Sequence, residues 1–96
     1  MFSEHIRELR VHKKLPQRVI ASALEIDTAT YCKIEKGERK AKEEYISVLS
    51  EIFEVSSESL LVLWLADQIV ELMSKHRAIA SSALNLVLQE EGYYRK

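Results

Sequence analysis

Proline and glycine are scarce in this chain, which has one proline and two glycines among its 96 residues. Hydrophobic residues make up 47% of the sequence and charged residues 30%, a balance typical of a folded helical protein and not of a disordered segment. We therefore predict few loops and an all-α fold. This length supports one core but not two independent cores, so residues 1–96 should form a single domain.

Cysteine and long apolar runs are scarce as well. Cys32 is the only cysteine, so no internal disulfide can form and stability has to come from packing; a reactive thiol is the alternative interpretation of this residue. The longest apolar run, Leu60 to Ala66, is far shorter than the roughly 18 residues that a membrane helix needs. No basic and apolar leader opens the sequence either, and we expect a cytoplasmic protein without a membrane segment.

The histidines are too few and too scattered to suggest catalysis. No recognisable motif places a Ser, Cys or carboxylate beside His5, His12 or His76. His5 and His12 would lie about 10 Å apart along one helix, too far to share a metal ion. Two glycines cannot build a Gly-rich phosphate loop. We therefore expect no enzyme, no metal, no cofactor and no small-molecule effector.

Neither sign of charge is in clear excess, because the net charge is −1. The two parts of the chain nevertheless differ. Residues 1–42 hold ten Lys or Arg and six Asp or Glu, a balance of +4, whereas residues 43–96 hold four and nine, a balance of −5. A basic front and an acidic back would turn the first part toward phosphates. The alternative interpretation is a random scatter of solvated charge.

Apolar residues at near-helical spacing predict three short helices in the first part of the chain. The first is expected over residues 3–13, and the second from Pro16 to about Glu25, because proline fits the first turn of a helix but not its interior. Asp27 is suited to cap a third helix, which Gly37 would end. The side chains expected to face the core are Phe2, Ile6, Leu9, Val11, Val19, Ile20, Ala21, Leu24, Tyr31 and Ile34.

Three further helices are predicted after the basic stretch 36–42. They should cover about 43–53, a long segment that starts at Ser56 or Ser57, and a segment with its apolar face between Ile79 and Leu88. The long fifth helix is apolar on nearly every side, so other helices have to pack against all of its faces. A second copy of the chain or the sixth helix can supply them, and both explanations can hold at once. The residues expected in a dimer interface are Leu61, Trp64, Leu65, Ile69 and Leu72.

A specific motif lies in residues 15–39, LPQRVIASALEIDTATYCKIEKGER. Gln17 stands at the start of the second helix and Ala21 midway along it, and Ile20 and Leu24 form a pair of apolar positions. The third helix ends in Glu, a basic residue and Gly, at Glu35-Lys36-Gly37. The segment resembles the helix-turn-helix of the Cro and phage-repressor family, often called XRE. The resemblance covers residues 3–63 and implies a five- to six-helix, lambda-repressor-like DNA-binding domain, with C-terminal dimerisation helices over residues 57–91.

The resemblance also implies roles for individual residues. Arg10 and Glu35 occupy positions that form an ion pair between the first and third helices of that family. Two residues depart from the family pattern. Pro16 replaces a hydroxyl side chain as the cap of the second helix, and Glu25 stands where the family prefers glycine in the turn. If Glu25 is left-handed, it should cost roughly 1 kcal/mol relative to glycine.

In such a domain the third helix enters the major groove of B-DNA. The residues then expected to face base edges are Thr28, Ala29, Thr30 and Lys33. Phosphate contacts are expected from Gln17 and Arg18 at the start of the second helix, and from Lys36, Arg39 and Lys40 after the third. Arg18 can instead be merely solvated, and Lys33 can instead contact a phosphate.

We therefore expect a sequence-specific transcriptional regulator that binds an inverted-repeat operator in double-stranded DNA as a homodimer. A restriction-modification controller is one form that such a protein takes. The alternative is an antitoxin or another protein-interaction module on the same fold, in which DNA binding is secondary to binding of a partner.

Overall fold

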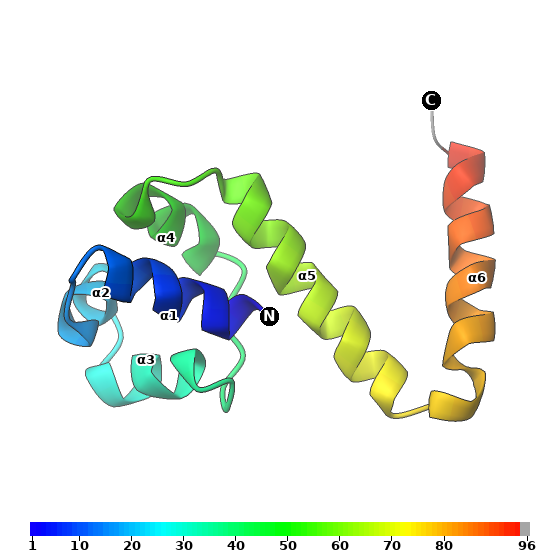
Figure 1. The fold of residues 1–96 in the computed structure, drawn as a ribbon, viewed down its shortest axis with the longest axis horizontal. Coiled ribbons are helices and arrows are strands. Elements are labelled where there is room, and N and C mark those ends of the chain that lie inside the picture. Colours follow the sequence, from blue (N-terminus) through cyan, green and yellow to red (C-terminus); the bar gives the residue numbers. More distant parts are fainter. Residues whose placement is uncertain (95–96) are drawn as a thin grey trace.

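The structure is a computed structural model that describes the backbone of residues 1–94 and the side chains of residues 1–90. Every regular element in that part of the chain is a helix, which confirms the predicted all-α fold (Figure 1). The helices are α1 (Phe2–His12), α2 (Gln17–Ala23), α3 (Thr28–Glu35), α4 (Tyr45–Phe53), α5 (Ser57–Ser74) and α6 (Arg77–Tyr94). None of them combines the length and the apolar character that crossing a membrane requires.

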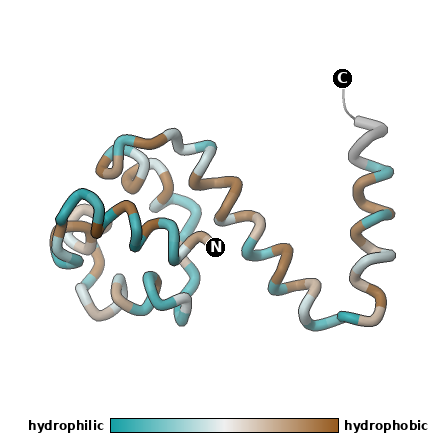
Figure 2. The backbone as a smooth tube through the Cα atoms, viewed as in Figure 1, coloured by the Kyte–Doolittle hydropathy of each residue, from teal (hydrophilic) through white to brown (hydrophobic). Residues whose placement is uncertain are grey.

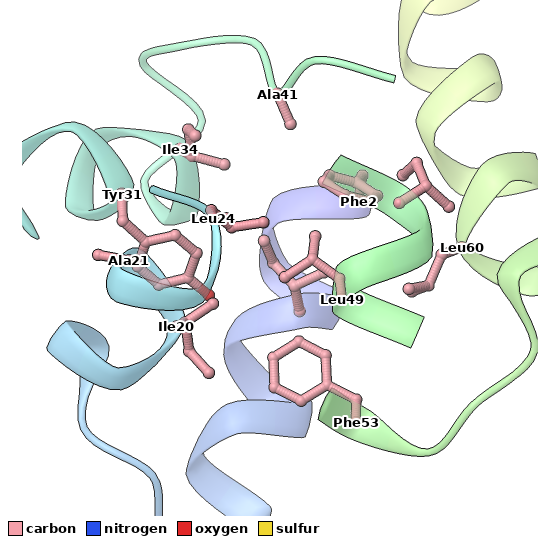
Figure 3. Close-up of a cluster of buried hydrophobic side chains, with 12 residues drawn as sticks. Phe2, Ile20, Ala21, Leu24, Tyr31, Ile34, Ala41, Leu49, Phe53 and Leu60 are labelled. Atoms are coloured by element: carbon pink, nitrogen blue, oxygen red, sulfur yellow. The ribbon is translucent and has the colours of Figure 1, made fainter. Parts of the chain in front are cut away.

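The core is formed by α1 to α4 together with the first turns of α5 (Figure 3). Tyr31, Phe53 and Leu60 are among its largest fully buried side chains. The other buried members are Phe2, Ile6, Ile20, Ala21, Leu24, Ile34, Ala41, Ile46 and Leu49. These residues come from five successive helices and from the segment that follows α3, and α3 is held in place by its contacts with α1 and α2.

Two residues predicted to face the core do not. Val11 is 53% exposed and Val19 is 41% exposed. Each residue advances a helix by about 100°, which places Val11 opposite the stripe formed by Phe2, Ile6 and Leu9. The same rotation moves Val19 about 100° away from Ile20. The prediction for these two valines was wrong because it counted apolar residues without their angle around the helix.

The turns between helices use left-handed backbone at several residues that are not glycine. Lys14, Glu25 and Glu54 have φ values of 58°, 61° and 57°. Gly37, which follows α3, has a φ of 78° and is suited to this conformation because it lacks a Cβ. Glu25 therefore adopts the left-handed form in the turn between α2 and α3, where a glycine would be less strained.

α5 is attached to the core along one side only. Leu60 is fully buried, Trp64 packs against the core, and Asp67 accepts a hydrogen bond of 2.8 Å from the backbone N–H of Phe2. The opposite side of the helix is open to solvent. The aliphatic side chains exposed there are Val62 at 59%, Leu65 at 52%, Ile69 at 43% and Leu72 at 65%.

α6 stands away from the core and diverges from α5 after the turn that joins them (Figure 1). The radius of gyration is 15.7 Å, compared with about 12.5 Å for a compact domain of this length. Near the start of α6, Ala80 is buried and Leu84 is half-buried. Hydrophobic stretches nevertheless continue along both helices (Figure 2). Within one chain, α6 therefore covers only a small part of α5.

Candidate nucleic-acid interface

Two backbone hydrogen bonds between residues near in sequence shape the turn between α2 and α3. The N–H of Glu25 donates to the carbonyl of Ser22 at 3.1 Å, and the N–H of Ile26 donates to the carbonyl of Ala21 at 3.0 Å. Asp27 then caps α3, since its carboxylate accepts a hydrogen bond of 2.6 Å from the N–H of Thr30. This bond lowers the pKa of Asp27, and the nearby positive charges of Arg39 and Lys33 lower it further. The carboxylate therefore belongs to the helix start and is partly neutralised by its neighbours.

One face of α3 is buried and the other is open. Tyr31 and Ile34 are 0% and 3% exposed and hold the helix against α1 and α2. The four residues expected at base edges lie away from these two. Thr28, Ala29 and Lys33 are exposed, and Thr30 is half-buried at the margin. Cys32 is half-buried beside them. The open face thus offers hydroxyl, methyl and ammonium groups.

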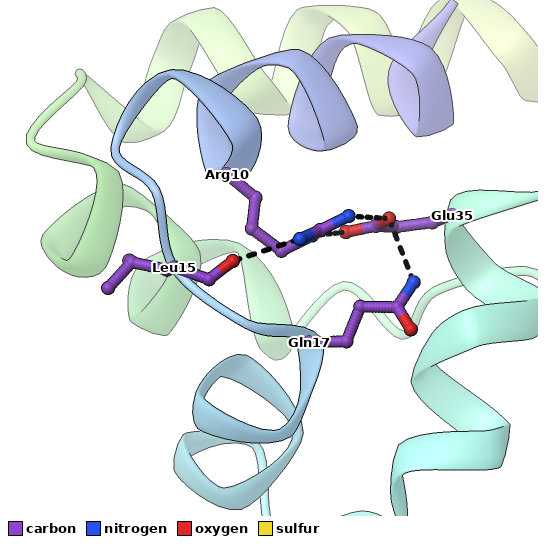
Figure 4. A network of polar contacts seen from close by, with 4 residues as sticks. All are labelled: Arg10, Leu15, Gln17 and Glu35. Atoms are coloured by element: carbon purple, nitrogen blue, oxygen red, sulfur yellow. Dashed lines mark hydrogen bonds and ion pairs between the residues drawn. The ribbon is translucent and has the colours of Figure 1, made fainter.

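A polar anchor behind α3 ties three elements together (Figure 4). The Arg10 guanidinium binds both carboxylate oxygens of Glu35, with Nε to Oε2 at 2.6 Å and Nη2 to Oε1 at 3.0 Å. Its Nη1 donates to the carbonyl of Leu15 at 2.9 Å, and Nε2 of Gln17 donates to Oε1 of Glu35 at 3.2 Å. The ends of α1, α2 and α3 are therefore joined through one carboxylate.

The charges in this anchor are shielded from solvent. The side chain of Glu35 is 2% exposed and that of Arg10 is 15% exposed. Burial alone would raise the pKa of Glu35, but the hydrogen bonds from its neighbours outweigh burial and lower it. Among the described residues the buried hydroxyl of Tyr31 has no hydrogen-bond partner, so we attribute the lowering of the Glu35 pKa chiefly to Arg10 and Gln17. Burial also raises the pKa of Tyr31, which keeps that hydroxyl neutral.

Gln17 is therefore part of the anchor as well as the first residue of α2. The sequence predicts that Gln17 contacts a phosphate. One of its amide hydrogens is used by Glu35, and because an amide nitrogen carries two hydrogens, the half-exposed side chain still has a donor for a phosphate. Arg18, the next residue, is exposed.

The basic segment after α3 is held in place by α5. Lys36, Arg39 and Lys40 are all exposed. The indole N–H of Trp64 donates to the carbonyl of Ala41 at 2.8 Å, and the Lys40 ammonium lies 5.5 Å from the centroid of the Trp64 ring. A cation over an indole face is attracted by the ring quadrupole. Trp64 thus positions the segment that carries the cations.

The sequence did not predict this role of Trp64, which was expected in a dimer interface. Its neighbour Leu61, assigned to the same interface, also packs against the core. The other three residues of that set, Leu65, Ile69 and Leu72, are exposed on α5. The signal for Trp64 was the polar end of its side chain, because a partly buried indole N–H usually finds an acceptor.

The comparisons with known proteins agree with this geometry. A family model described as helix-turn-helix matches residues 6–60, which include the turn, the polar anchor, the basic segment and the first residues of α5. No curated protein and no solved structure matches the chain. The matched segment exceeds half of the sequence and contains all residues expected to contact DNA, and the chain therefore belongs to the helix-turn-helix family of Cro and phage-repressor type, a family of DNA-binding transcriptional regulators.

Proposed function

We propose that the chain is a sequence-specific transcriptional regulator that binds an inverted-repeat operator as a homodimer. The observation that carries the proposal is the open face of α3, which presents Thr28, Ala29 and Lys33 to solvent while Tyr31 and Ile34 fix the opposite face in the core. A helix held in this way fits the major groove of B-DNA, which is wide enough for one helix. The regulator would act in the cytoplasm.

Each exposed group on this surface has a partner on DNA that suits its chemistry. Lys33 can donate to guanine O6 or N7, Thr28 can hydrogen-bond several bases, and the methyl groups of Ala29 and Thr30 can meet thymine. The groups proposed for phosphate contacts lie at the edges of α3, at Gln17, Arg18, Lys36, Arg39 and Lys40. Phosphate contacts position the domain and base contacts give specificity, so the two groups should respond differently to mutation.

The exposed side of α5 supports the dimer. Val62, Leu65, Ile69 and Leu72, here called the α5 seam, are spaced three, four and three residues apart. This order is the same in both directions, so two antiparallel copies can pair about a two-fold axis between Leu65 and Ile69. Such pairing would also place Glu58 near the basic end of the partner helix, at Lys75 to Arg77. The proposed seam keeps three of the five residues expected from the sequence and adds Val62.

This arrangement divides the chain into two parts with different tasks. Residues 3–63 would form the DNA-binding core, and the helices over residues 57–91 would form the dimer. Because Leu60 and Trp64 join α5 to the core on the side opposite the seam, the dimer would set the distance between the two α3 helices. That distance should be about 34 Å, one turn of DNA.

Selection from a pool of random duplexes tests the proposal. We expect an enriched inverted repeat whose half-sites are centred about 10 base pairs apart. Enrichment of a single half-site would refute the dimer but keep the DNA-binding role. If no duplex is enriched over the starting pool, the sequence-specific function is refuted.

The uncovered surface of α6 favours a second candidate function, an antitoxin or another module that binds a protein partner and uses DNA binding secondarily. Ile79 and Leu86 are each 62% exposed in one chain, as expected of a surface that meets another protein. The genes beside this one would distinguish the forms of regulator. A toxin gene supports the antitoxin, and a methyltransferase or nuclease gene supports a restriction-modification controller.

A further inference from the structure

α6 carries an apolar surface that the described part of its own chain leaves uncovered. Ile79 and Leu86 are each 62% exposed, Val87 is 59% exposed and Leu88 is 55% exposed. Residues 78–89 contain no charged side chain. A solvated helix normally carries charges on its outer face, so this one is suited to be covered.

The surface that would suit α6 lies on α5 of another copy. The α5 seam is exposed, and the surrounding stretch 59–66 is also free of charge. In one chain the two helices diverge from their connecting turn (Figure 1). Among the described side chains of α6, Ala80 near that turn is the one that is buried. The far half of α6 therefore does not reach the first half of its own α5.

We propose that α6 is an exchanged arm: in the dimer, each α6 packs against α5 of the other chain, and the second copy occupies the open side of the α5–α6 hairpin. This inference rests on the homodimer of the proposed function. It adds that the interface is incomplete without α6 of the partner. The four helices α5 and α6 of both chains would form a small bundle with a shared apolar interior.

The size of the exposed surface supports this arrangement. The α5 seam alone offers about 400 Å² per chain, half of the roughly 800 Å² per partner in a standard stable interface. Adding Ile79, Leu86 and Val87, the exposed residues of α6 that share one face, brings the aliphatic surface to on the order of 700 Å², which is close to a standard interface. Pairing through α5 alone would leave nearly half of this apolar surface in water.

The charge pattern favours a second copy as the occupant. Residues 78–89 carry no charge, so a charged partner would gain no ion pairs from them. Electrostatic complementarity needs charges on both surfaces. The uncharged α5 stretch of another copy is a matching surface. The exchange is also reciprocal, since each chain gives one arm and receives one, which closes the assembly at two copies.

Cross-linking between α5 and α6 tests the exchange directly. In a Cys32→Ser background, a chain with Val62→Cys is mixed with a differently tagged chain with Leu86→Cys, and a flexible bismaleimide is added without DNA. We expect a covalent product that contains both tags. In the double variant Val62→Cys/Leu86→Cys, a cross-linked product of monomer mass would overturn the proposal, because α6 would then fold back on its own α5. Absence of the mixed product from a sample that sediments as a dimer would also overturn it.

Sedimentation equilibrium of single variants supplies a second measurement. Leu86→Lys should raise the dimer dissociation constant at least about 100-fold, since each dimer loses two buried leucines. The matched control is Val11→Lys, at a valine on α1 that is 53% exposed, and it should leave the constant unchanged. If Leu65→Lys dissociates the dimer but Leu86→Lys does not, the arm is refuted while the homodimer stands. Failure of the DNA selection would refute the proposed function without affecting either result.

Discussion

Replacing Arg10 by methionine should unfold the domain before it weakens any single DNA contact. The substitution removes three hydrogen bonds, two to the Glu35 carboxylate and one to the carbonyl of Leu15. Glu35 would remain with a side chain that is only 2% exposed and a single hydrogen bond, from Gln17. A buried charge that loses its partner destabilises a protein by roughly 3–5 kcal/mol, and the whole free energy of unfolding of a small domain is about 5–15 kcal/mol.

Urea denaturation followed by circular dichroism measures this effect. The urea midpoint of Arg10→Met should fall by at least about 1 M, because the free energy of unfolding of small proteins falls by roughly 1–3 kcal/mol per molar urea. Gln17→Leu is a useful comparison, since it removes one hydrogen bond and should cost only about 1 kcal/mol. An unchanged midpoint in Arg10→Met would refute the argument that this ion pair holds the three helices together.

The dependence of stability on pH gives the same argument a second test. The folded-state pKa of Glu35 is lowered below its ordinary value of 4.5, so the ionised carboxylate stabilises the fold at any pH above that value. This stabilisation should be lost as the pH falls through the lower, folded-state pKa. Without Arg10, burial would dominate and raise the pKa of Glu35. The difference in free energy of unfolding between the wild type and Arg10→Met should therefore shrink in acid, where the carboxyl of Glu35 is protonated in both proteins.

Three further substitutions test separate parts of the structure. Lys33→Ala should weaken binding to the selected duplex by roughly 1–3 kcal/mol and relax the preference at one base pair; equal weakening on all duplexes would assign Lys33 to a phosphate instead. Trp64→Phe keeps an aromatic ring near Lys40 but loses the hydrogen bond to Ala41, so it should cost about 1 kcal/mol in stability and reduce the salt dependence of DNA binding by about one phosphate contact. An unchanged salt dependence would show that Trp64 does not position Lys40. Glu25→Gly should stabilise the turn by up to roughly 1 kcal/mol, because Glu25 has a φ of 61°, and a lower midpoint in urea would contradict the strain argument.

The parts of the fold that depend on local chemistry were predictable from the sequence. Asp27 caps α3 with its side chain, as expected from its place before an apolar rhythm. Gly37 follows the same helix in the left-handed conformation. Tyr31 and Ile34 are buried at a spacing of three residues. In each case the determining interactions lie within a few residues, so the sequence contains both partners close together.

The parts that depend on distant contacts were not predictable. The hydrogen bond from Trp64 joins residues 23 positions apart, and apolar character alone suggested only that the indole would be covered. α6 presents the same limit on a larger scale. From the sequence, its apolar residues fit equally well against their own α5 or against a second copy. The divergence of the two helices in space (Figure 1) supports the second copy that we propose.

The two faces of α5 give the proposed dimer a mechanical consequence. Leu60 and Trp64 fix one face to the core and to the basic segment, and the α5 seam lies on the other. A helix that is rigid between these faces would transmit any change in the seam to the spacing of the two α3 helices. Repacking Leu65 or Ile69 should therefore change the preferred half-site spacing while leaving the preferred bases within each half-site unchanged. In the proposed complex those bases would be contacted by residues of α3, whose orientation is set by the Arg10–Glu35 anchor inside each chain and would not depend on the partner.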